Sequence, residues 1–443
     1  MGKLNQDQAI YDARVLGKPR MMLLGFQHMF AMFGATVLVP ALTGLSVSAT
    51  LLFAGIGTLL FHFITKLKVP AFLGSSFAFI GGYAAVVSMG AAQGLDQAAS
   101  LPYACIGVFF AGLMYFVLAG LFKAFGVKKV MRFFPPIVTG PIIIAIGLTL
   151  SGSAINNCHT NWWIALLALV TIVTANIWGK GMIKIVPILL GVVVSYTVAG
   201  LAGEADFSKV ADAAWIGLPF QMQDTAFAVL KNPNWGLVLT AIICILPISL
   251  ATMIEHIGDM CAISSTTRIN YLEEPGLHRT LSGDGLATAI ASLFGAPANT
   301  TYGENTGVLN ITRVFDPKVI RIAAVLAILF SFSPKFAAIV AAMPGATIGG
   351  VSLVLYGMIA SVGVRNLIES KINLGESRNL IILSMILVLA VGISYGPGGI
   401  VISLGKATIS LSGLAVAAVA GILLNALLPG KDKSGEMDLN VEK

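Results

Sequence analysis

Apolar segments of about 20 residues recur along the whole chain, and they limit the folds that it can adopt. A helix of that length crosses the roughly 30 Å hydrocarbon core of a bilayer. Only 11% of the residues are charged, whereas soluble domains hold about a quarter. We therefore predict an all-α polytopic membrane protein. Its segments, about 14 in number, are expected near residues 22–42, 48–65, 71–90, 101–122, 134–153, 162–178, 183–202, 236–257, 280–295, 299–312, 319–333, 345–363, 379–396 and 408–428.

The positive charges fall almost entirely in alternate loops of this arrangement. Of the 27 Lys and Arg residues, only Lys209, Lys231, Lys335 and Lys406 fall in loops on one side, and the other 23 fall on the opposite side. Cytoplasmic loops carry such an excess, so both termini are predicted to be cytoplasmic. The same excess accounts for the net charge of +7 without a nucleic-acid partner, because no basic run is interleaved with aromatic residues.

The two halves of the chain repeat each other weakly. QHMFAM at 27–32 is similar to EHIGDM at 255–260, SSFA at 75–78 to TTYG at 300–303, and PPIVTG at 135–140 to PGATIG at 344–349. The three matches occur in the same order in both halves, and each half holds about seven segments. Because seven is odd, the second half must enter the membrane from the opposite face. This is the inverted-repeat design of secondary transporters.

Two of the segments, 71–90 and 299–312, are weak as helices. They contain GSSFAFIGG and NTTYGENTG, which are rich in Gly, Ser and Thr. Irregular backbone at membrane depth persists only where it lines a cavity or is buried in protein. We therefore expect a site near the bilayer midplane, where 75–78 and 300–303 approach each other. Half-helices that start there would direct unpaired backbone N–H groups at the site.

Only four of the 20 acidic residues lie within the predicted segments: Glu255, Asp259, Asp284 and Glu304. Intramembrane acids are costly and usually mark a substrate or proton path. Glu255 and Asp259 are four residues apart, so they share a helix face. Two carboxylates at such a short distance in a low dielectric should not both ionise easily. This pair can therefore hold a proton near neutral pH. The alternative for each acid is structural pairing, which we favour only for Asp284.

Aromatic and histidine side chains accompany the repeated motifs. Phe77 and Tyr302 either pack in the core or form a stacking surface for a flat heterocycle. His28 and His256 lie beside Gln27 and Glu255, where a structural hydrogen bond is a commoner role than proton transfer. The chain shows no catalytic motif and no metal-ligand spacing. We therefore expect a protein that is not an enzyme and uses no cofactor.

The run ENTGVLNITR at 304–313 resembles the signature of the nucleobase–ascorbate transporters, also called nucleobase:cation symporter-2. That signature is Gln, Glu or Pro, then Asn, any residue, Gly, four residues, Thr, and finally Arg, Lys or Gly. The likeness extends through GSSFAFI, EHIGD, PGLHR, NTTYGEN and GGVSLVLYG. It is greatest to the bacterial members that transport uracil, which carry Glu at the first signature position, where xanthine and urate members usually carry Gln. Glu304 stands at that position here.

The resemblance implies two inverted seven-span repeats, with short antiparallel β-strands in spans 3 and 10. It also implies a core domain that moves against a gate domain, and a proton symporter that forms dimers in the bacterial inner membrane. The expected parts are a cytoplasmic tail (1–20), core spans 1–4 (21–125), gate spans 5–7 with an external loop (126–234), core spans 8–11 (235–336), gate spans 12–14 (337–429) and a second cytoplasmic tail (430–443).

The resemblance also implies the residues that would bind uracil. Glu255 should hydrogen-bond the polar edge of the base, and Gly303 and Glu304 should make backbone contacts. Phe77 should supply a backbone N–H and a ring contact, and Tyr302 should pack on the base.

Other residues of the matched motifs are expected to support this site: Asn305, Arg313, Tyr356, His28 and His256. The coupling proton is expected on Glu304, Asp259 or Glu255. Some uracil-transporting members carry His at the position of Asp259, so the role of that His does not transfer directly.

The resulting hypothesis is proton-coupled uptake of uracil and related pyrimidines. A purine permease of the same fold, for xanthine or urate, is the nearest alternative. An anion transporter or channel is a further alternative, but the predicted midplane holds acids and no Lys or Arg. A sensor that binds without transporting belongs to a different class, and uptake measurements would distinguish it.

Overall fold

The computed structural model describes residues 9–126, 129–130, 132–231, 233–396, 399–404 and 407–430. The predicted tails at 1–20 and 430–443 therefore lie partly outside the described residues, and Lys406 lies outside them as well.

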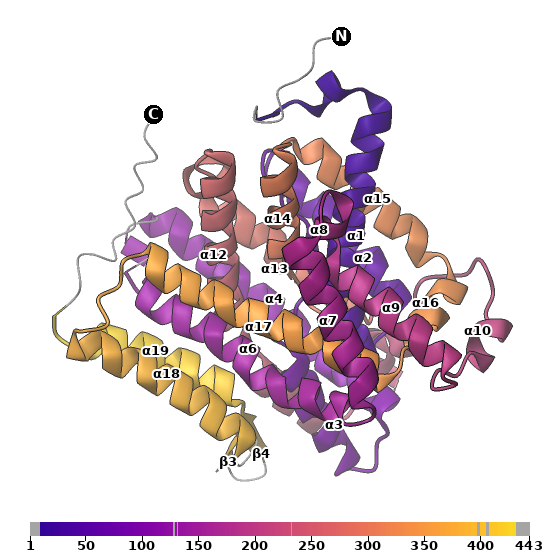
Figure 1. Ribbon diagram of the computed structural model, residues 1–443. Helices are drawn as coiled ribbons and strands as arrows, with labels where there is room; N and C mark the ends of the chain where they lie inside the picture. Colours follow the sequence, from indigo (N-terminus) through magenta and orange to yellow (C-terminus); the bar gives the residue numbers. More distant parts are fainter. Residues whose placement is uncertain are drawn as a thin grey trace.

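Most of the chain forms helices that pack side by side (Figure 1). The first half contains η1 (Ala13–Leu16), α1 (Lys18–Thr43), α2 (Val47–Ile64), α3 (Ile80–Ala91), α4 (Gln97–Phe125), α6 (Pro136–Cys158), α7 (Trp162–Trp178), α8 (Met182–Ile185), α9 (Pro187–Leu201), α10 (Ser208–Asp212), η2 (Met222–Asp224) and η3 (Ala226–Lys231). The second half contains α11 (Trp235–Ile245), α12 (Ile248–Thr267), η4 (Leu272–Gly276), α13 (Leu277–Leu293), α14 (Gly303–Thr312), α15 (Pro317–Ser331), α16 (Pro334–Ala341), α17 (Gly345–Glu369), α18 (Ser377–Tyr395) and α19 (Gly413–Leu427).

The described residues include seven helices long and apolar enough to cross a membrane, with α11 and α12 counted as one. An eighth span would join α15 to α16, which meet at a bend of 89°. Shorter apolar helices are α3, α7, α9 and α19. Each of the predicted segments overlaps a helix. The chain is thus an all-α polytopic membrane protein, and the count of about 14 spans depends on including the shorter helices.

A two-stranded antiparallel sheet joins the two halves of the chain at the predicted place. Its strands are β1 (Leu73–Ser75) and β2 (Asn299–Thr301), and Gly74 pairs with Thr300 at the centre of the register. Two further hydrogen bonds extend it, from Ser76 N–H to the Ala298 carbonyl at 2.8 Å and from Tyr302 N–H to the Phe72 carbonyl at 3.0 Å. The expectation of short antiparallel strands in these two segments is confirmed.

The helices that flank the two strands carry matching residues. On α2, the Thr58 hydroxyl donates to the Leu73 carbonyl of β1 at 3.2 Å. On α13, the Thr288 hydroxyl donates to the Asn299 carbonyl of β2 at 2.9 Å. A glycine lies three residues before each threonine and allows close helix contact: Gly55 meets α15, and Gly285 meets α4. The two halves therefore hold their strands in the same way.

The helices pack in two groups. Helices α1, α2, α3, α4, α11, α13 and α15 contact mainly one another, and α6, α7, α9, α17, α18 and α19 do the same. Figure 1 shows α6 and α17 running side by side, and they form the most extensive helix pair. Contacts between the groups come from α1 and α12, which touch α9, α17, α6 and α19.

A second antiparallel hairpin was not expected from the sequence. Strands β3 (Ile400–Leu404) and β4 (Ala407–Leu411) lie at one end of α18 and α19 (Figure 1), and β4 contacts α11. The predicted span at 408–428 therefore begins as a strand. Both strands are rich in Ile, Val, Ser and Thr, and β-branched residues favour paired strands.

The described N-terminal residues lie across the loop between α14 and α15. Ile10 N–H donates to the Arg313 carbonyl, and Phe315 N–H donates to the Ile10 carbonyl, each at 2.8 Å. Ala13 N–H donates to the Asp316 carboxylate, and Tyr11 donates its hydroxyl proton to the carbonyl that ends α12, also at 2.8 Å. This segment ties α12, α14 and α15 together at one face.

Candidate functional site

The paired strands β1 and β2, called the strand crossing from here on, bring the starts of two helices close together. Tyr302 follows β2 directly in extended conformation, and α14 begins at the next residue. α3 begins a few residues after β1. Neither N-cap residue, Tyr302 or Phe79, makes a side-chain capping bond to a described residue. The first N–H groups of a helix have no intrahelical partner, so both starts present donors and a partial positive charge.

The Tyr302 side chain links the residue after β2 to β1 by hydrogen bonds. Its hydroxyl donates to the Ser75 carbonyl at 2.9 Å and lies 3.1 Å from the Ser75 hydroxyl. Ser75 in turn donates to the Thr36 carbonyl of α1 at 2.9 Å. The Tyr302 ring covers Gly74, where a Cβ would lie 2.4 Å from the ring. Tyr302 is only 4% exposed, so its observed contacts are structural ones.

Glu255 and Asp259 lie on α12 beside the crossing, and both are half-buried. The Thr301 hydroxyl of β2 donates to Asp259 Oδ2 at 2.6 Å. This bond connects the acid to the strand that leads into α14. α12 also packs against β2 and α14.

The first turn of α14 is open. Gly303 is exposed, and apart from its chain neighbours and the backbone of its own helix no described atom lies within 4 Å of the position that a Cβ would take there. Glu304 follows it and is half-buried. A flat molecule can therefore approach the Gly303 backbone closely, with a carboxylate beside it.

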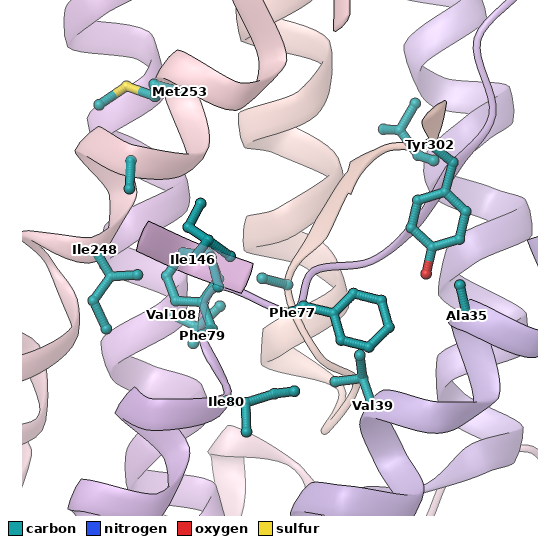
Figure 2. Close-up of a cluster of buried hydrophobic side chains, with 14 of the residues drawn as sticks. Ala35, Val39, Phe77, Phe79, Ile80, Val108, Ile146, Ile248, Met253 and Tyr302 are labelled. Atoms are coloured by element: carbon teal, nitrogen blue, oxygen red, sulfur yellow. The ribbon is translucent and has the colours of Figure 1, made fainter. Parts of the chain in front are cut away.

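Phe77 joins the two groups of helices at this point. Figure 2 shows its ring directed toward α1, on the side of Ala35 and Val39, whereas Phe79 is directed the other way. The Phe77 ring meets the ring of Tyr356 on α17 edge-on, with centroids 5.8 Å apart. Phe77 is 7% exposed and Tyr356 is 2% exposed.

Two histidines support neighbouring elements. Asn305 Nδ2 of α14 donates to the His28 carbonyl of α1 at 3.0 Å and lies 3.1 Å from His28 Nδ1. His256 Nδ1 lies 3.1 Å from the Asp284 carboxylate of α13, and both side chains are fully buried. The structural pairing expected for Asp284 was with an Arg or a helix end; instead Asp284 lies within α13, and its neighbour is a histidine.

Arg313 stays outside the cluster. It ends α14 in left-handed conformation, at the opposite end of the helix from Glu304, and it is exposed. The structure therefore brings together Phe77, Glu255, Asp259, Tyr302, Gly303, Glu304 and Asn305, with His28, His256 and Tyr356 behind them.

Three residues of the crossing have no role in the sequence prediction: Ser75, Thr301 and Thr36. The first two belong to the repeated pair of hydroxyl residues in SSFA and TTYG, so the repeat itself was a signal for them. Thr36 becomes visible only from the packing of α1 on β1.

The arrangement suits a small, uncharged, planar ligand with both donors and acceptors. The carboxylates of Glu255 and Glu304 can accept hydrogen bonds from N–H groups of a ligand. The backbone N–H groups at the helix N-termini can donate hydrogen bonds to its carbonyl oxygens. A site built from matched polar groups rejects analogues that leave a buried group unpaired.

The chain is similar to known proteins in sequence and in fold. The Xan_ur_permease model of a permease family matches residues 19–399. Uracil permease of Bacillus caldolyticus is 41% identical over 93% of this chain and 93% of its own length. Uracil permease of Bacillus subtilis is 39% identical over 91% of each. Among solved structures, the transmembrane domain of the cyanobacterial bicarbonate transporter BicA is similar in fold, with a TM-score of 0.60 at 18% identity, covering 93% of this chain and 99% of that one.

Proposed function

Because the chain belongs to the xanthine and uracil permease family, and is therefore a transporter and not an enzyme, we propose that it carries uracil into a bacterial cell through the inner membrane. The observation that carries this substrate is the identity of about 40% with proteins named uracil permease, over more than nine-tenths of the chain. Related pyrimidines are further candidate substrates.

In this proposal uracil lies on the open backbone of Gly303. Glu255 accepts hydrogen bonds from the ring N–H groups, and backbone N–H groups at the start of α14 and near Phe77 donate to the carbonyl oxygens. Support comes from the exposure of Gly303 and from the two half-buried carboxylates beside it. Tyr302 then holds the crossing in shape beneath the base, because its hydroxyl is already bonded to Ser75.

The same proposal couples uptake to protons. Ionised carboxylates at membrane depth are costly. A proton taken up by Glu304, Asp259 or Glu255 removes that cost as the loaded site closes. The bond from Thr301 to Asp259 favours a coupling role for Asp259, because it links the acid to the strand that leads into α14.

We propose alternating access in which the two groups of helices move against each other. We assign the core to residues 21–125 and 235–336 and the gate to 126–234 and 337–429. The packing within each group supports this division, and the matching pairs Gly55–Thr58 and Gly285–Thr288 support two inverted seven-span repeats. The homodimer is proposed on the family resemblance alone.

Transport of an anion, as in the structurally similar bicarbonate transporter, is less well supported. A likeness at 18% identity concerns the fold only. The cluster at the crossing contributes carboxylates, and Arg313 is exposed at the far end of α14. Transport of xanthine is also less well supported. Members of the family that transport xanthine or urate usually carry Gln at the position of Glu304.

Uptake of labelled uracil by the purified protein in proteoliposomes, under an imposed inward proton gradient, tests the proposal. We expect Glu255→Gln and Glu304→Gln each to lower the rate at least tenfold. An acid-to-amide change on the outer loop, Glu204→Gln, is the matched control and should leave uptake unchanged. Wild-type rates in either site variant would remove that residue from the mechanism, and effective competition by xanthine would change the assigned substrate.

A further inference from the structure

A cavity unrelated to the strand crossing lies between helices of the two groups. Its volume is about 670 Å³. Its lining includes Leu121 and Phe125 of α4, Leu250 of α12, and Val419, Ile422 and Leu423 of α19. In the division proposed above, α4 and α12 belong to the core and α19 to the gate. The cavity therefore lies at the boundary between the two parts that move.

The cavity lining is apolar with one exception. Nine of the ten lining residues are apolar, and the tenth is Lys129 in the connection between α4 and α6. Several of the apolar side chains remain uncovered: Phe125 is 57% exposed, Phe133 53% and Leu423 52%. A polar metabolite in this cavity would leave its hydrogen-bonding groups unpaired, which is unfavourable. Hydrocarbon chains fit the lining.

Lys129 has no partner among the described residues, in either hydrogen bonds or ion pairs, and its side chain is exposed. The stretch 121–135 carries Lys123, Lys128, Lys129 and Arg132 and no acidic residue. The topology prediction places this connection on the cytoplasmic side. Basic residues next to a groove between membrane helices on that side attract the head groups of anionic lipids.

We propose that this cavity binds an anionic phospholipid of the cytoplasmic leaflet. Its acyl chains lie between α4 and α19, along Leu121, Phe133 and Leu423, and its phosphate pairs with Lys129. Because the lipid touches helices of both groups, it stabilises the conformation in which α4 and α19 are far enough apart to hold it. The lipid composition of the membrane thereby affects the balance between transport states.

Thermal unfolding of the full-length protein in detergent micelles tests this site, followed by intrinsic fluorescence. The probes are phosphatidylglycerol, phosphatidylcholine with the same chains, and glycerol phosphate, which lacks chains. We expect phosphatidylglycerol to raise the Tm by several degrees and the other two to leave it unchanged. Equal shifts with phosphatidylcholine would overturn the charge recognition, and a shift with glycerol phosphate would overturn the lipid assignment.

Two variants address the cavity itself. Lys129→Glu should raise the phosphatidylglycerol concentration needed for half of the shift at least fivefold, and Val419→Trp should abolish the shift by filling the groove. Lys209→Glu makes the same charge change on the outer loop and should behave as the wild type. A wild-type response of either Lys129→Glu or Val419→Trp would refute the site, so one well-folded variant is sufficient. The readout does not require uracil, so it stands apart from the test of substrate.

Discussion

Gly74 at the centre of β1 gives a sharp test of the strand crossing. A Cβ at this position would lie 2.4 Å and 2.5 Å from two atoms of the Tyr302 ring, and 2.8 Å from the Thr36 hydroxyl. Ordinary carbon contacts are about 3.5–4.0 Å, so the ring would have to move by roughly 1 Å. It cannot do so freely, because the Tyr302 hydroxyl is bonded to the Ser75 carbonyl on the same strand.

The cost of Gly74→Ala can be built from these contacts. Overpacking a tight core costs about 1–3 kcal/mol. Loss of the Tyr302 bond leaves a buried carbonyl unpaired, at about 1–3 kcal/mol more. The sum is about 2–6 kcal/mol. With an unfolding entropy of about 2 cal/mol/K per residue, a chain of this length should lose roughly 2–6 °C in Tm. Uracil binding should fall as well, because the start of α14 shifts with the strand.

Gly81→Ala is the matched control. Gly81 lies six residues after the end of β1, in the first turn of α3, and no described atom lies within 4 Å of its Cβ position. Its Tm should stay within about 1 °C of the wild type, because alanine is favoured in helices. Fluorescence-monitored unfolding and uracil binding measure both variants. A wild-type Tm and affinity for Gly74→Ala, or equal losses for both variants, would refute the reasoning.

Three further outcomes are expected. Thr301→Val removes the hydroxyl that donates to Asp259 and should slow proton-driven uptake several-fold, with recovery in Thr301→Ser. Asn305→Leu leaves His28 without its α14 partner and should lower the unfolding free energy by about 1–3 kcal/mol in denaturation of the purified protein. Removal of residues 1–16 should lower the Tm by a few degrees without changing the affinity for uracil, because Ile10, which pairs with Arg313 and Phe315, lies at the far end of α14 from Gly303. A loss of affinity would contradict that placement.

The sequence predicted the strand crossing for a physical reason. Gly, Ser and Thr in GSSFAFIGG and NTTYGENTG cannot form a stable lipid-facing helix, and their repetition pointed to one shared location. The acids were identifiable because each intramembrane carboxylate needs an explanation. The bond from Thr301 to Asp259 was not predictable, since it depends on the strand register and on how α12 lies against β2.

Other features were missed through reliance on apolar length. The predicted span at 408–428 took in most of β4, whose residues are largely apolar, whereas β3 at 400–404 lay outside every predicted segment. The bend after α15 had a visible signal in Pro334, which begins α16 directly after its N-cap Ser333. A proline is tolerated at a helix start and disrupts a helix interior, so it marks the place where a new helix begins.

The pairing of β1 with β2 also sets an order for biogenesis. A ribosome adds roughly 5–20 residues per second, so the 224 residues that separate Ser75 from Asn299 take about 10–45 s to synthesise. During that interval β1 is in the membrane without its partner, and each unpaired backbone group there costs several kcal/mol. The first half of the chain must therefore be held by the insertion machinery, or remain incompletely inserted, until the second half arrives. Neither half can form the site alone.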